Sequence, residues 1–171
     1  MNELQKKYSN EIETILAKYP PERRRSAVMP LLYLAQANDG SVTRQAAGEI
    51  ADILEMGVTE VASIIGFYTL FHLEEGGRYR IQVCNDLPCA LRGADEFLEE
   101  LSQRLGIAVG ETTADGLFTL EAVKCLAACD RAPMFQLQGG GDIKYYEDQS
   151  VDMVMALVED LRQKTSKEGA A

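Results

Sequence analysis

Apolar residues recur every three to four positions through residues 1–75, which is the periodicity of amphipathic helices. This pattern predicts four helices and therefore an N-terminal helical bundle. The first helix carries Ile12 to Tyr19 and ends at Pro20-Pro21. The second runs from Glu22 to Gly40 with a kink at Pro30. The third is capped by Thr43 and ends at Gly57, and the fourth begins at Thr59.

The fourth predicted helix is apolar on more than one side. Phe67 and Leu70 lie off its main apolar stripe, which consists of Val61, Ile64, Ile65, Tyr68 and Phe71. Such a helix is either central in its own bundle or covered by a partner protein, and the sequence leaves both alternatives open. His72, the only histidine, is expected near the C-terminal end of this helix, either as a surface residue or as a residue that interacts with the helix dipole.

The pattern changes after Glu74-Glu75-Gly76-Gly77, a stretch typical of a linker or hinge. The expected order beyond it is a strand at 79–83, a helix at 91–105, strands at 117–123, 133–137 and 143–146 with a turn at 139–142, and a final helix that is capped by Ser150 and followed by a frayed tail from Lys164. The sequence therefore predicts an α+β or α/β fold in two domains, a helical bundle at 1–75 and a four-stranded domain at 76–171.

The overall composition limits the classes of function. The net charge of −10 argues against a nucleic-acid partner, because phosphate binding needs clustered Lys and Arg. The basic cluster Arg23-Arg24-Arg25 is interpreted as a solvated first helical turn, with a docking contact as the alternative. No apolar run approaches the roughly 18 residues of a membrane span, and the N-terminus lacks the apolar segment of a signal peptide. We therefore expect a cytoplasmic protein without direct membrane insertion.

The four cysteines form two close pairs, Cys84 with Cys89 and Cys125 with Cys129. Four thiolates can complete a tetrahedral zinc site or a two-iron cluster, so this spacing predicts a metal centre. Structural disulfides are disfavoured without a secretory signal, and neither pair has the Cys-x-x-Cys spacing of a thioredoxin-type dithiol. The spacing favours an iron–sulfur cluster over zinc but leaves both alternatives open.

The order of the predicted elements places the two cysteine pairs together. A strand–helix–strand unit makes its two strands parallel, and each cysteine pair directly follows one of these strands. Both pairs should therefore emerge at the same edge of the sheet, as a single four-thiolate centre requires. No phosphate-binding loop occurs, and one histidine cannot supply the two of a Rieske-type site. The sequence indicates an electron carrier rather than a catalyst.

The stretch Val83–Ala94 resembles the first cluster motif of the thioredoxin-like [2Fe-2S] ferredoxins. More specifically, it is similar to the peripheral iron–sulfur subunit of respiratory NADH:quinone oxidoreductase, complex I. The resemblance covers nearly the whole chain, because it continues through Gly110–Thr119 and Cys125–Pro133 and includes Arg24–Gln36 and Gly66–Thr69 in the helical half.

This resemblance implies a thioredoxin-like domain with one [2Fe-2S] cluster, in which each iron has two cysteine ligands. The four ligands would be Cys84, Cys89, Cys125 and Cys129. The helical half would cover a flavoprotein subunit that binds NADH and FMN, so that NAD and FMN are reached only through this partner. The chain would then be an oxidoreductase subunit in the peripheral arm of complex I, at the cytoplasmic face of the inner membrane, and would exchange one electron with FMN.

The same subunit type also serves NAD-dependent formate dehydrogenases and multimeric hydrogenases, which remain as alternatives. A different class is an adaptor without a redox role, in which the four cysteines hold structural zinc. One residue departs from the family pattern, since Ala127 stands where the family usually has glycine. Alanine adopts a positive φ only at a cost, so we expect a slight difference in the local backbone or in the reduction potential.

Overall fold

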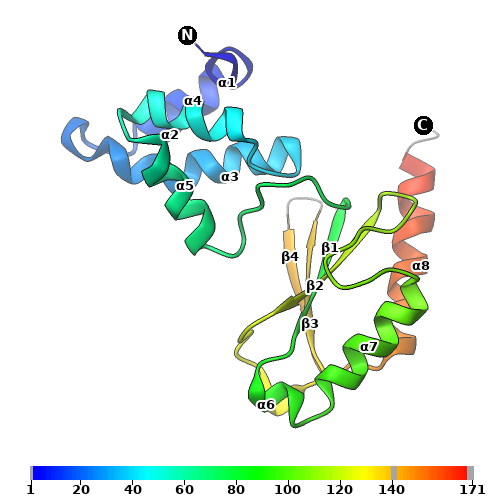
Figure 1. Ribbon diagram of the computed structural model, residues 1–171. Coiled ribbons are helices and arrows are strands. Elements are labelled where there is room, and N and C mark those ends of the chain that lie inside the picture. Colours follow the sequence, from blue (N-terminus) through cyan, green and yellow to red (C-terminus); the bar gives the residue numbers. More distant parts are fainter. Residues whose placement is uncertain (1, 140–141, 169–171) are drawn as a thin grey trace. The chain divides into compact units, whose positions relative to one another are not determined.

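The chain folds as two units, Met1–Glu75 and Gly76–Ala171, and the division falls within the stretch predicted to be a linker. The computed structural model describes residues 2–139 and 142–168. The first unit contains helices, and the second combines a sheet with helices (Figure 1).

The first unit is a helical bundle. Its elements are α1 (Glu3–Lys7), α2 (Ser9–Leu16), the 3-10 helix η1 (Pro21–Ala27), α3 (Val28–Asp39), α4 (Arg44–Leu54) and α5 (Val58–Phe67). The fully buried side chains of its core include Leu31, Leu32, Ile50 and Val61. Thr43 caps α4 as predicted, because its hydroxyl accepts a hydrogen bond from the Ala46 N–H at 3.1 Å. A cap of this kind contributes about 1 kcal/mol to helix stability.

Two predicted helix boundaries in this unit are wrong. The single helix expected from Glu22 is η1 followed by α3, so Pro30 lies in the first turn of α3 instead of kinking a longer helix. A proline breaks no helical hydrogen bond there, since the first N–H groups of a helix have no partner within it. Gly57 does not close α4, because Glu55 takes the left-handed conformation at that end. Gly57 instead starts α5 by donating its N–H to the Glu60 carboxylate at 2.9 Å.

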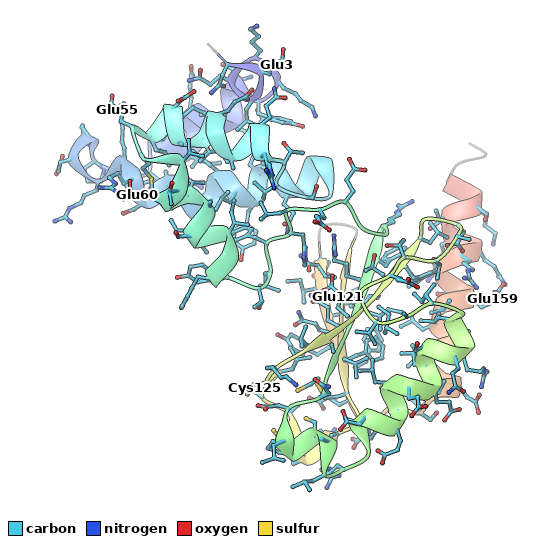
Figure 2. The ribbon with its side chains drawn as sticks, viewed as in Figure 1. Glu3, Glu55, Glu60, Glu121, Cys125 and Glu159 are labelled. Atoms are coloured by element: carbon cyan, nitrogen blue, oxygen red, sulfur yellow. The ribbon has the colours of Figure 1, made fainter. Side chains whose placement is uncertain are left out.

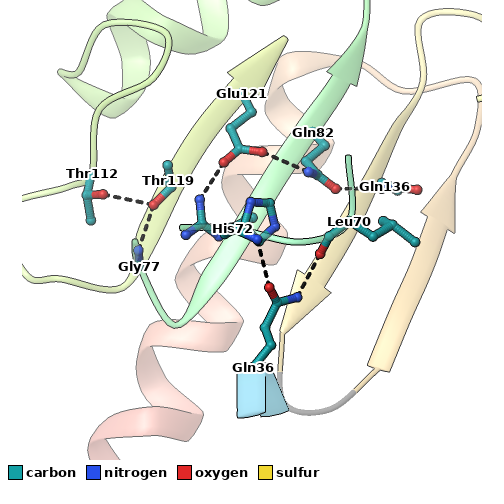
Figure 3. Close-up of polar contacts among 10 residues, drawn as sticks. Gln36, Leu70, His72, Gly77, Gln82, Thr112, Thr119, Glu121 and Gln136 are labelled. Atoms are coloured by element: carbon teal, nitrogen blue, oxygen red, sulfur yellow. Dashed lines mark hydrogen bonds and ion pairs between the residues drawn. The ribbon is translucent and has the colours of Figure 1, made fainter. Parts of the chain in front are cut away.

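His72 does not lie at the end of a helix, because α5 ends five residues earlier, at Phe67. The His72 N–H donates to Gln36 Oε1 at 2.8 Å, and the Gln36 amide nitrogen donates to the Leu70 carbonyl at 2.7 Å (Figure 3). The His72 carbonyl accepts the Val42 N–H at 2.6 Å. These bonds hold the segment after α5 against the helical unit, so the predicted interaction with the helix dipole is wrong.

The second unit is built on a mixed four-stranded sheet. Its strands are β1 (Tyr79–Cys84), β2 (Phe118–Val123), β3 (Phe135–Gly139) and β4 (Asp142–Tyr146), in the order β2-β1-β3-β4. β1 and β2 are parallel, whereas β3 is antiparallel to both β1 and β4. The parallel pairing predicted from the strand–helix–strand order is confirmed. The turn predicted at 139–142 includes Gly140 and Gly141, which lie outside the described residues.

Helices α7 (Ala94–Leu105) and α8 (Val151–Glu168) cover one face of this sheet (Figure 1). Their apolar side chains, among them Leu101 and Val154, pack against Ile81 and Phe118 of the strands. The helix predicted from Leu91 begins later, because Gly93 takes a positive φ of 89° and a short helix, α6 (Leu87–Ala90), precedes it. Helix α8 continues to Glu168, so the frayed tail predicted from Lys164 is wrong up to that residue.

The other face of the sheet is polar. The Gln136 amide donates to Gln82, and the Gln82 amide donates to the Glu121 carboxylate (Figure 3). The same carboxylate accepts from the Arg80 guanidinium. These groups satisfy one another across three strands, as buried polar groups must. Because alternate residues of a strand share a face, Cys84 continues the side of β1 that carries Arg80 and Gln82.

Gly77 packs closely against this sheet. Its N–H donates to Thr119 Oγ1 at 2.6 Å (Figure 3). A Cβ atom at Gly77 would lie 2.7 Å from the Leu117 carbonyl oxygen, so a glycine is needed here for the close approach of two backbones. Gly77 is therefore fixed against the sheet, at the C-terminal end of the stretch predicted to be a linker or hinge.

Candidate metal centre

The four cysteines lie on two neighbouring segments. Cys84 is the last residue of β1 and Cys89 lies in α6, whereas Cys125 follows β2 and Cys129 begins the 3-10 helix η2. Because β1 and β2 are parallel up to their last residues, both segments leave the sheet at the same edge. Figure 2 shows Cys125 on the loop at this edge. The predicted placement of both pairs at one sheet edge is confirmed.

The centre has a buried side and an exposed side. Cys84 and Cys89 are buried, Cys129 is half-buried and Cys125 is exposed. An apolar cluster separate from the main core of this unit surrounds the buried thiols, and it includes Ala94, Ala132 and Met134, with Leu126 and Ala128 packed against it. The Ala132–Pro133 peptide bond beside this cluster is cis.

Three of the four thiols interact with one another. Burial, together with the neighbouring thiols of Cys84 and Cys129, raises the pKa of Cys89 to about 12. The side chain of Cys125 is exposed, while its backbone N–H lies against the Cys84 sulfur. Within residues 2–139 and 142–168, no three His, Cys, Asp or Glu side chains are arranged to hold a metal ion. The thiols of Cys84 and Cys129 neighbour that of Cys89 and the Cys125 backbone N–H lies beside Cys84, but these side chains are not arranged as a metal-binding group.

Backbone N–H groups from both segments point at the Cys84 sulfur. Burial alone would raise the pKa of this thiol. The N–H groups of Asp86, Leu126 and Cys125, with the Cys89 thiol, stabilise the thiolate and hold the pKa of Cys84 below its usual value. Hydrogen bonds to cysteine sulfur are one of the features that set the reduction potential of iron–sulfur centres.

A side-chain bridge beside the cysteines was not predicted. The Lys124 ammonium donates to the backbone carbonyl of Asn85 at 3.2 Å and to its side-chain Oδ1 at 2.8 Å. In sequence these residues directly flank Cys125 and Cys84. Only the parallel alignment of the two strand ends brings them together, so sequence spacing alone carries no signal for this bridge.

A family model described as thioredoxin-like [2Fe-2S] ferredoxin matches residues 12–162, a span that includes both cysteine pairs. The chain belongs to this ferredoxin family.

Relatives from Rickettsia prowazekii and Thermus thermophilus are among those that align with most of the chain. It is 43% identical to the E subunit of the NADH-quinone oxidoreductase of Rickettsia prowazekii over 155 residues, which are 90% of this chain and 85% of the relative. It is 40% identical to NADH-quinone oxidoreductase subunit 2 of Thermus thermophilus over 151 residues, which are 88% and 82% of the two chains. The resemblance inferred from the sequence motifs is confirmed.

A solved structure shares the fold. The NAD+-reducing [NiFe]-hydrogenase in the air-oxidized state superposes with a TM-score of 0.66 at 20% sequence identity, over 80% of this chain. The matched region is 23% of that hydrogenase chain, so this chain spans less than a quarter of its length. At this identity the likeness shows the thioredoxin-like ferredoxin fold alone.

The residues at the sheet edge fit the [2Fe-2S] cofactor of this family. Thiolates are the ligands that iron–sulfur clusters take, and both cysteine pairs of the chain lie here. Backbone N–H groups already point at one sulfur, and the apolar cluster shields the buried side of the centre. The segment between Cys125 and Cys129 has only small or aliphatic uncharged side chains, which leaves its backbone accessible to sulfur.

Ala127 takes a positive φ of 60° in this segment, and Cys125 takes one of 53°. We expect a slight difference in the local backbone or in the reduction potential here, and Ala127 takes the left-handed conformation that glycine adopts without strain. For a residue with a Cβ atom, this conformation costs roughly 1–2 kcal/mol. The segment is therefore strained at Cys125 and Ala127.

Replacing Ala127 with glycine should relieve this strain and make the cysteine segment more stable. We expect Ala127→Gly to stabilise the folded segment by about 1 kcal/mol, which corresponds to roughly fivefold slower iron loss to a chelator at neutral pH. Ala128→Gly is the matched control, because Ala128 has an ordinary negative φ of −130°. Equal behaviour of the two variants would contradict the strain argument.

Proposed function

We propose that this chain is the electron-transfer iron–sulfur subunit of an NADH-quinone oxidoreductase, complex I. The observation that carries this proposal is that both cysteine pairs lie at the carboxyl ends of two parallel strands, β1 and β2. The chain is also 40% to 43% identical to subunits of NADH-quinone oxidoreductases. When bound, the [2Fe-2S] cluster supplies one-electron chemistry. The polypeptide supplies thiolate ligands, N–H donors and a fitted surface.

Within this proposal Cys84, Cys89, Cys125 and Cys129 would all be ligands of the cluster, two to each iron. The first pair is buried and the second is partly exposed, so the second pair marks the side open to an electron donor.

The donor in this proposal is a flavoprotein subunit that binds NADH and FMN. A hydride carries two electrons, and a one-electron centre needs a flavin between itself and NADH. The helical unit would dock this partner through an exposed aromatic surface formed by Phe67 and Tyr68. Phe67 is 76% exposed, and the two rings lie edge to face with centroids 5.1 Å apart. Exposed aromatic side chains of this size are typical of protein interfaces.

The proposed location is the peripheral arm of the complex, at the cytoplasmic face of the membrane. Among the described residues, no helix has the length and apolarity of a membrane span. Membership of an NAD-dependent formate dehydrogenase or multimeric hydrogenase is the second candidate. The NAD+-reducing hydrogenase shares the fold at 20% identity, whereas the relatives at 40% identity or more are named as subunits of NADH-quinone oxidoreductase.

Metal and sulfide analysis tests this proposal. The purified chain should contain two irons and two acid-labile sulfides, with zinc well below one atom per chain. Reduction with dithionite should give the paramagnetic signal of a one-electron-reduced two-iron centre. One zinc per chain with no sulfide would instead support the zinc-stapled adaptor.

A further inference from the structure

Lys124 links the two cysteine-bearing segments where they leave the sheet. Its ammonium group makes two hydrogen bonds to Asn85, of 3.2 Å to the carbonyl and 2.8 Å to Oδ1. Asn85 directly follows Cys84, and Lys124 directly precedes Cys125. One cation is therefore held one residue away from a cysteine of each pair.

The partners of this cation are neutral oxygen atoms. Within the part of the chain that the structure describes, Lys124 forms no ion pair with a carboxylate. Asp95 joins the network only through the Asn85 amide, which donates to its carboxylate at 3.3 Å. Arg131, two residues after Cys129, is instead paired with two carboxylates, those of Glu147 and Asp148. The charge of Lys124 is thus fixed in place but not cancelled by a directly bonded anion.

We propose that Lys124 is a positioning residue that raises the reduction potential of the cluster by holding a cation beside both cysteine segments. One-electron reduction adds a negative charge to the centre, and a fixed nearby cation stabilises the reduced form more than the oxidised form. Asn85 is the support that holds the ammonium group in place. This inference rests on the proposed function, because it needs a redox-active cluster on these cysteines.

The alternative is that Lys124 only ties the two segments together. Exposed lysines often contribute little to stability, and a tie would act through geometry alone. The two roles respond differently to two changes. An effect of charge is kept by arginine and is weakened by salt, whereas a geometric effect is insensitive to salt.

A redox titration of the cluster-loaded full chain separates these roles. At low ionic strength and fixed pH, Lys124→Gln should lower the ratio of reduced to oxidised cluster at a given potential about fivefold, or roughly 40 mV for a one-electron couple. Lys124→Arg should stay within about twofold of the unmodified chain. The deficit of Lys124→Gln should shrink between about 0.01 M and 1 M salt, as the Debye length falls from about 30 Å to about 3 Å.

Two further variants complete the test. Lys144→Gln removes an exposed β4 lysine that lies 3.8 Å from Asp142, and it should leave the potential unchanged. Asn85→Asp keeps an oxygen that accepts from the Lys124 ammonium group, but its negative charge offsets the positive charge of Lys124. This variant should therefore lower the reduction potential, as Lys124→Gln does. Iron and sulfide are measured for every variant.

Each failure has a distinct meaning. A Lys124→Gln chain with full iron and sulfide and an unchanged potential would overturn the inference and leave the proposed function intact. A shift that Lys124→Arg shares, with the same size at all salt concentrations, would also overturn it in favour of a geometric tie. Absence of iron and sulfide from the unmodified chain would contradict the proposed function itself.

Discussion

Serine in place of Cys84 is expected to lower the iron and sulfide content of the purified chain about tenfold or more, because a hydroxyl is a poor ligand for iron in a thiolate site. Cys84 is fully buried and receives N–H groups from both segments, so no exposed side chain or solvent ligand can easily replace its sulfur. The measurement is the ratio of iron and sulfide to protein, followed with the visible absorbance.

The position of each cysteine sets the size of this effect. Cys125 is exposed, so Cys125→Ser should keep more iron than Cys84→Ser but lose it faster to a chelator. Ala90→Ser is a matched control. Ala90 follows Cys89 in α6, so this substitution introduces a hydroxyl beside the site without removing a thiol. Full iron and sulfide in Cys84→Ser would show that this residue is not a ligand.

The second large effect is expected from removing the helical unit. A fragment of residues 76–171 should fold and hold its cluster, because both cysteine pairs and all the described strands lie within it. It should nevertheless bind the flavoprotein at least about tenfold more weakly than the full chain, a loss of about 1.4 kcal/mol or more. Iron content, far-UV circular dichroism and titration calorimetry measure these outcomes.

Single substitutions localise the same effect. Phe67→Ala in the full chain should weaken flavoprotein binding more than Val58→Ala, a control on the same helix that is 55% exposed. Aromatic anchors usually contribute more than aliphatic residues at protein interfaces. A fragment that binds the flavoprotein as tightly as the full chain would contradict the docking role of the helical unit. A fragment that cannot hold iron would contradict the claim that residues 76–171 fold without the helical unit.

The architecture was predictable wherever a local pattern and a topological rule agreed. Alternation of Tyr79, Ile81 and Val83 predicts β1, and the strand–helix–strand order makes β1 and β2 parallel. That one rule also places the cysteine pairs together. Helix α1 was missed because it has only five residues, too few for periodicity to register, and depends on the Asn2–Gln5 capping box.

The details of the site were less predictable, because they depend on contacts between distant residues or on tertiary context. Ala127 and Cys125 take positive φ values that their residue types disfavour, so local propensity gives the wrong expectation. Gly77 is typical of a hinge by composition, yet the close approach of Leu117 is what requires glycine. The Lys124–Asn85 bridge joins residues 39 positions apart, and only the register of the sheet reveals it.

The central claim is that this chain exchanges single electrons with the flavin of a flavoprotein. The flavin in turn exchanges a hydride with NAD, so the chain does not react with NAD directly. It is tested most directly by mixing the dithionite-reduced chain, freed of excess reductant, with NAD+ in the absence of oxygen. Two reduced chains, one NAD+ and one proton should give two oxidised chains and one NADH. We expect the cluster absorbance to recover only when the NADH- and FMN-binding flavoprotein is present. Recovery without the flavoprotein, or no recovery with it, would contradict the account.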